Sequence, residues 1–168
     1  VADETTGQAW DQDTKSVVWS TTKGMVSMCA LKLADEGKLD LFAPVTDYWP
    51  EYGQNGKQNT LVAHLLSQQH GVPVVSERIP LNGTFDWDQM VHMIEQQEPF
   101  YEPGTKVSYA PLMYGWLVGE VVRRVCGKSL GSYFRDEIAS PLDADCWIGL
   151  PPELEPQVAR MTAPPMVF

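Results

Sequence analysis

The stretch VVWSTTKGMVSMCALKLADEG, from Val17 to Gly37, carries the clearest helical pattern in the sequence. Apolar residues recur at helical spacing from Thr21 onward, and Gly37 stands where a C-terminal cap is expected. The pattern predicts a helix that begins near Ser20 and ends at Gly37. Ser20 and Lys23, three residues apart, would then lie on one face of its first turn.

Four more segments have apolar residues at helical spacing, and loops rich in proline, glycine and asparagine separate them. The predicted helices span 61–71, 86–97 and 112–127, and a last helix begins at Ser129 or Ser132 and ends at Pro141. Only short stretches such as 16–19, 101–111 and 145–152 have the character of strands. The sequence therefore predicts a mainly α (α+β) fold in a single domain that covers residues 1–168.

The composition is that of an ordinary globular protein, with 43% hydrophobic and 20% charged residues. A formal net charge of −10, without a cluster of lysine or arginine, opposes binding to a phosphate backbone, so no nucleic acid partner is expected. Apolar runs are far shorter than the roughly 20 residues that cross a bilayer, so no membrane partner is expected. The first residues also lack the basic and then apolar order of a signal peptide.

The cysteines and histidines form no metal-binding or disulfide pattern. Three cysteines at irregular spacing, Cys29, Cys126 and Cys146, fit reduced thiols in a cytoplasmic protein. The three histidines have no carboxylate or cysteine at a metal-binding spacing. We therefore expect a cytoplasmic protein without a metal site.

Ser20 and Lys23 have a spacing that suits nucleophilic catalysis. A serine hydroxyl attacks an acyl group only when a base takes its proton, and the amine of Lys23 lies one helical turn away. The free N–H groups of the first turn would stabilise the oxyanion of an acyl transfer. Lys23 would have to be partly buried to act as this base. The alternative is structural, with Ser20 as the helix cap and Lys23 as a solvated side chain.

Three segments follow one another in an informative order. The first is WSTTKGMVSMCALKLADEGKLDLFAPVTDYWPE, in which Ser-x-x-Lys opens a helix. The second, LVAHLLSQQHGVP, has a helix that ends in a Leu-Leu-Ser-x-x-x-Gly turn, and the third is EPGTKVSYAPLMYGWLVGEVVRRVCGKSLGSYFRDEIASPLDADCWIGLP. In this order they resemble the serine beta-lactamase and penicillin-binding protein superfamily, and specifically its esterase-like branch related to class C beta-lactamases, the class VIII-type carboxylesterases.

The resemblance implies a serine hydrolase that works through an acyl-enzyme. Ser20 would be its nucleophile, Lys23 the base, and Tyr109 the residue that shares the proton with Lys23, since Tyr109 matches the tyrosine of the family's Tyr-x-Asn element. Pro111 stands where that element has asparagine and offers no side-chain amide to a lactam. The expected substrate is therefore a small carboxylic ester or related acyl compound, and no cofactor is implied.

The family's third element, Lys-Thr-Gly or an equivalent on a sheet strand, is not found in the sequence. The strands expected before the Ser-x-x-Lys helix and after residue 150 are not found either, and half of the oxyanion hole would be missing with them. The resemblance thus implies the helical region of a beta-lactamase-like fold with little of its antiparallel sheet. A complementing segment or a second copy of the chain would cover the missing sheet.

The alternative function is a catalytically inactive helical interaction module derived from such a hydrolase. Apolar surface left where the sheet should lie would favour self-association of this module.

Three aromatic residues are the candidates for substrate binding. Tyr48, Trp49 and Tyr52 lie in a predicted loop, where helical packing does not explain them. Because ligand sites are largely apolar, we expect these rings to line the acyl pocket.

Overall fold

The computed structural model describes residues 1–162 of the chain. These residues form two compact units. One unit comprises Val1–Trp19 together with the described residues from Gly149 onward, and the other is Ser20–Ile148. All three predicted catalytic residues belong to Ser20–Ile148.

The unit that contains the first 19 residues has little regular structure. Among its described residues, the backbone forms isolated bridges, antiparallel between Asp3 and Gln8 and parallel between Lys15 and Val158. A short 3-10 helix, η6 (Pro152–Gln157), adds about two turns and includes Pro152 and Pro156. The stretch 16–19 therefore forms no strand within the described residues.

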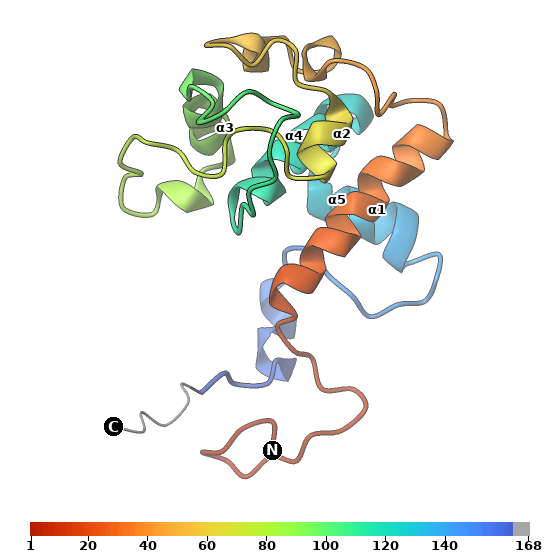
Figure 1. The fold of residues 1–168 in the computed structure, drawn as a ribbon. Coiled ribbons are helices and arrows are strands. Elements are labelled where there is room, and N and C mark those ends of the chain that lie inside the picture. Colours follow the sequence, from red (N-terminus) through yellow and green to blue (C-terminus); the bar gives the residue numbers. More distant parts are fainter. Residues whose placement is uncertain (163–168) are drawn as a thin grey trace. The chain divides into compact units, whose positions relative to one another are not determined.

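The larger unit consists of short and medium helices (Figure 1). Its α-helices among the described residues are α1 (Thr22–Asp35), α2 (Val62–Leu66), α3 (Trp87–Gln96), α4 (Met113–Cys126) and α5 (Leu130–Phe134). The shorter turns are η1 (Trp19–Thr21), η2 (Val45–Asp47), η3 (Pro50–Gly53), η4 (Gly83–Phe85) and the π-helical turn η5 (Arg135–Ala139). No β-sheet forms among residues 1–162. The predicted mainly helical fold with little sheet is thus confirmed.

Local residue chemistry sets most helix limits. The carboxylate of Asp86 caps α3 by accepting from the N–H of Gln89 at 3.0 Å, and Gly127 ends α4 in a left-handed conformation with φ of 70°. The prediction was wrong for α2, which is shorter than 61–71. Gln68 adopts a φ of 60°, which turns the chain out of the helix soon after Leu66.

Helix α4 is the centre of the larger unit, because it packs against α1, α2, α3 and α5. Its side chains Leu117, Val121 and Val122 are fully buried. Gly119 allows close packing against α3, since a Cβ atom at this position would stand 2.8 Å from the ring of Trp87. The five helices thus share one hydrophobic core.

A buried carboxylate links α3 and α4 inside this core. Glu120 is fully buried and accepts from Trp87 Nε1 at 2.8 Å, Arg123 Nε at 2.7 Å and Arg124 Nε at 2.7 Å. Burial alone would raise the pKa of Glu120, but these hydrogen bonds outweigh it and lower the pKa. The carboxylate is therefore charged and fully partnered at neutral pH.

We predict that Glu120→Gln lowers the free energy of unfolding by about 3 kcal/mol at neutral pH, because it leaves two arginines beside a group without charge. Urea denaturation of both proteins would measure this difference. It should shrink as the pH falls below the ordinary carboxylate pKa of 4.5, since the stability gained from a lowered pKa is lost on protonation. Asp136→Asn, at a solvent-exposed ion pair with Lys128, is the control and should change stability little.

Candidate active site

Ser20 lies where the chain enters α1. The turn η1 (Trp19–Thr21) leads directly into α1 at Thr22, and the preceding Trp19 has a φ of 48°. A left-handed backbone at a bulky aromatic residue is uncommon and costs about 1 kcal/mol or more. The chain therefore bends sharply immediately before the predicted nucleophile.

The structure brings the three predicted catalytic side chains together. Lys23 Nζ donates to Ser20 Oγ at 3.1 Å, and Ser20 Oγ shares a hydrogen bond of 2.5 Å with the hydroxyl of Tyr109. Lys23 Nζ also lies 5.0 Å from the centre of the Tyr109 ring. The Ser20 hydroxyl is thus in contact with both groups that could take or return its proton.

The second acceptor of Lys23 is a backbone oxygen. Its Nζ donates to the carbonyl of Pro111 at 2.8 Å. Among the described residues, both hydrogen-bond acceptors of this half-buried lysine are therefore neutral, and no carboxylate pairs with it. Sequence reasoning treated Pro111 only as a missing amide and overlooked its carbonyl, because every residue has one and no residue type marks it.

These contacts change the acidity of the Tyr109 phenol, although the side chain is 55% exposed. The hydrogen bond with Ser20 first, and then the adjacent Lys23, lower the pKa of its phenol. A phenol with a lowered pKa exchanges its proton more readily at neutral pH.

A second pair of hydroxyls lies one turn further along α1. Ser27 Oγ donates to the carbonyl of Lys23 at 2.8 Å and shares a 2.6 Å hydrogen bond with the hydroxyl of Tyr114 in α4. Sequence reasoning missed both residues. Their signal is weak, since Ser27 is simply one turn after Lys23 on the same helix.

The structure corrects the prediction for the acyl pocket. Trp49 and Tyr52 have no exposed surface and belong to the hydrophobic core, where Trp49 Nε1 donates to Glu95 Oε1 at 2.7 Å. Tyr48 is half-buried and lines a groove with Ala34, which is 14 residues, or about 20 Å along a helix, from Ser20. None of the three rings lies beside the nucleophile.

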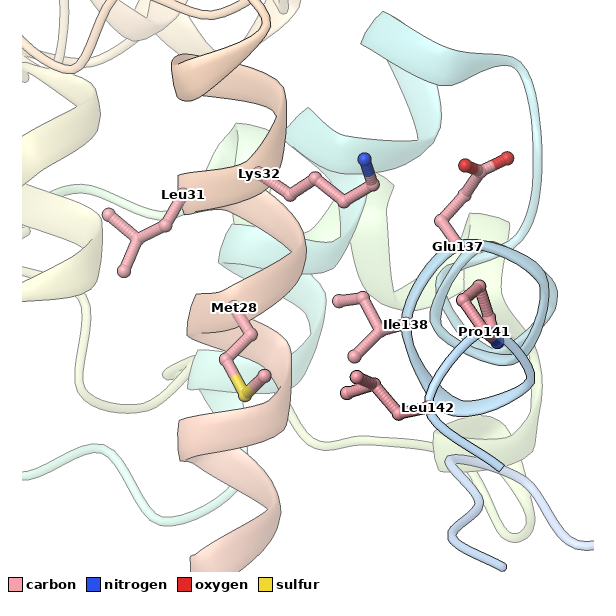
Figure 2. Close-up of a pocket in the computed structure, with 7 residues that line it drawn as sticks. All are labelled: Met28, Leu31, Lys32, Glu137, Ile138, Pro141 and Leu142. Atoms are coloured by element: carbon pink, nitrogen blue, oxygen red, sulfur yellow. The ribbon is translucent and has the colours of Figure 1, made fainter. Parts of the chain in front are cut away.

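An apolar groove lies between α1 and η5 (Figure 2). Its volume is about 350 Å³, and it is lined by Met28, Leu31, Lys32, Glu137, Ile138, Pro141 and Leu142. Met28 and Leu31 are nearly half exposed there, and Leu142 is more so. Ile138 and Leu142 face α1 across the groove, which does not include Ser20.

The cysteines, a metal site and a membrane helix were also considered from the sequence. The thiol of Cys29 is buried in the core, and burial raises its pKa to about 12. Within residues 1–162 no three histidine, cysteine or acidic side chains gather as a metal site would require. No helix in this part of the chain has both the length and the apolar character that a membrane crossing needs.

Comparison with known proteins identifies the family. The Beta-lactamase family matches residues 1–167. This chain belongs to the beta-lactamase family. The resemblance inferred from the sequence motifs is therefore confirmed.

One curated relative is the esterase/beta-lactamase LipL of Mycobacterium tuberculosis, which is 36% identical to this beta-lactamase family chain over 161 residues. The match covers 92% of the chain and 36% of LipL. The crystal structure of a family VIII carboxylesterase matches with a TM-score of 0.92 and 44% identity, over 96% of the chain and 45% of that protein. A penicillin-binding protein homologue from Caulobacter crescentus matches with a TM-score of 0.92 and 36% identity, over 98% and 44%.

The chain thus spans less than half the length of these relatives. It corresponds to the helical part of the beta-lactamase-like fold. The alternative of an inactive interaction module finds no support in relatives named as an esterase/beta-lactamase and a carboxylesterase.

We predict that Tyr109 ionises below the ordinary tyrosine pKa of 10. The difference in phenolate absorbance between wild type and Tyr109→Phe during an alkaline titration isolates this group. Ser20→Ala should move its titration to higher pH, because the hydrogen bond with Ser20 is the largest cause of the lowered pKa. An unchanged titration in Ser20→Ala would contradict the hydrogen bond between the two hydroxyls.

Proposed function

We propose that this chain carries the nucleophile and proton-transfer groups of a serine hydrolase, which acts through an acyl-enzyme on a small carboxylic ester or related acyl substrate. The observation that carries the proposal is the position of the Ser20 hydroxyl, 3.1 Å from Lys23 Nζ and 2.5 Å from the Tyr109 hydroxyl. An N-cap serine with a solvated lysine would need neither contact. The esterase names among the relatives support the same assignment.

In the proposed first step, Ser20 Oγ attacks the ester carbonyl while the neutral amine of Lys23 takes the hydroxyl proton. The N–H groups of the first turn of α1 stabilise the negative oxygen of the tetrahedral intermediate. When the intermediate collapses, the bond to the leaving alcohol breaks and the phenol of Tyr109 donates its proton to that oxygen. Lys23 then passes the proton that it took from Ser20 to the phenolate, which restores both the phenol and the neutral amine. Water then releases the acid from Ser20 by the same steps in reverse.

Two features of the site support an ester as the substrate. Pro111 has no side-chain amide that could bind the amide of a lactam, and its carbonyl already accepts a hydrogen bond from Lys23. The exposed position of Tyr109 also suits a leaving alcohol that departs into solvent.

We further propose that full activity needs the remainder of the fold, supplied by a complementing segment. The chain spans 44% and 45% of its two structural relatives, and Met28, Leu31 and Leu142 leave apolar surface exposed beside α1. Burying this surface would be favourable by roughly 25 cal/mol per Å². A cytoplasmic location stays a prediction from the sequence.

The first test is covalent labelling with a small fluorophosphonate, followed by intact-mass measurement. We expect one adduct on the wild type, none on Ser20→Ala, and labelling about a hundredfold slower on Lys23→Met, because the base is lost. Ser140→Ala, at an exposed serine, is the matched control and should label like the wild type. Equal labelling of Ser20→Ala would remove Ser20 as the nucleophile.

The second test is gel filtration with mass measurement of the chain alone. We expect slow ester turnover by a monomer, and faster turnover when the sheet-forming part of a related protein is added. A stable dimer with full turnover would instead make a second copy the complementing partner. If the added sheet-forming part leaves ester turnover by the monomer unchanged, the proposal that full activity needs the remainder of the fold is refuted.

A further inference from the structure

Tyr109 lies on a segment that neither a helix nor a sheet holds. Residues 105–111 have no regular structure between the turn at Glu102 and α4. The Tyr109 side chain is more than half exposed, so packing does not fix it either. The position of its hydroxyl on Ser20 therefore depends on how the backbone on both sides of Tyr109 is held.

One residue holds both neighbours of Tyr109. The backbone carbonyl of Gln68 accepts from the N–H of Ser108 at 3.1 Å, and the side-chain Oε1 of the same residue accepts from the N–H of Ala110 at 2.6 Å. Gln68 thus binds the backbone immediately before and immediately after the tyrosine. These two bonds take the place of the pairing that a neighbouring strand would provide.

The conformation of Gln68 is unusual. It follows the C-terminal end of α2 with a φ of 60°, which is uncommon for a residue other than glycine. Because of this turn, the carbonyl of Gln68 does not point along the axis of α2 as the helical carbonyls do. It accepts a hydrogen bond from the N–H of Ser108 instead. Leu65, fully buried, anchors α2 in the core just before this turn. Strain of about 1–3 kcal/mol at such positions is characteristic of functional sites.

We propose that Gln68 is a positioning residue, which holds the Tyr109 hydroxyl on Ser20 Oγ through its two hydrogen bonds to the backbone of residues 108–110. This inference rests on the proposed function, since it assigns Gln68 a role in the same proton transfer. The bond between Lys23 and Pro111 holds the other end of the segment. The side chain of Ala110 is fully buried in the hydrophobic core and also holds the segment, so Gln68 fixes the backbone on either side of Tyr109 in addition to that packing.

The test uses two variants in which the side chain at position 68 can no longer accept the hydrogen bond from the N–H of Ala110. Gln68→Asn shortens the side chain by one methylene and suits the left-handed backbone, and Gln68→Met keeps the volume without a strong acceptor. Gln68→Glu keeps an acceptor oxygen and should rescue function. Gln69→Met makes the same change in a neighbouring side chain that holds none of residues 108–110 in the described structure, so it is the control.

The readouts are the kinetics of fluorophosphonate labelling and the phenolate titration of Tyr109. We expect kinact to fall about tenfold or more in Gln68→Asn and Gln68→Met, with KI unchanged, because misplacing a reacting group by about 1 Å can cost a hundredfold. The Tyr109 titration should move to higher pH in the same variants. Gln69→Met should retain both wild-type values, and Gln68→Glu should retain the wild-type labelling rate.

Failure of this inference can be told apart from failure of the proposed function. If the wild type labels and the two Gln68 variants label equally fast, Gln68 does not position Tyr109. If the wild type does not label at all, the proposed function fails, and the titration alone decides the inference: an unchanged Tyr109 titration in the folded variants overturns it. Thermal unfolding of each variant establishes which of the two substitutions leaves the protein folded.

Discussion

The site depends on the two hydrogen bonds of one ammonium group. Lys23 Nζ joins Ser20, just before α1, to the carbonyl of Pro111, which lies 88 residues after Lys23 in the chain. Tyr109 lies two residues before that carbonyl, so the same bond that holds the segment also keeps its phenol near Ser20. Both of these acceptors are neutral.

The packing of α1 against α4 makes this arrangement stable. Tyr114 is buried at the start of α4, and its hydroxyl shares a hydrogen bond with Ser27, which in turn bonds the carbonyl of Lys23. The first turn of α1 and the entry to α4 are thus connected through buried groups on one side. On the other side, Tyr109 and Ser20 are exposed within the described residues.

Helix geometry explains what could be predicted from the sequence. The spacing of Ser20 and Lys23 fixes their contact once α1 is recognised, whereas Tyr109 was found only through the family resemblance, because nothing local ties it to a residue 89 positions away. The carbonyl of Pro111 and the left-handed turn at Gln68 have no marker in residue type. Trp49 and Tyr52 were assigned to a pocket because loop composition does not show whether a side chain is buried. The Glu95 carboxylate, which accepts a hydrogen bond from the indole of Trp49, also lies far from Trp49 in sequence.

The hydrogen bonds around Ser20 and Tyr109 all lie within one stretch of the chain, which has a consequence for evolution. The hydrogen bonds of Ser20, Lys23, Gln68 and Tyr109 all lie within the unit Ser20–Ile148, because they join side chains and backbone groups of residues 20–111. Under the proposed function, a longer protein that contains this stretch would keep all of these groups while its remaining residues changed.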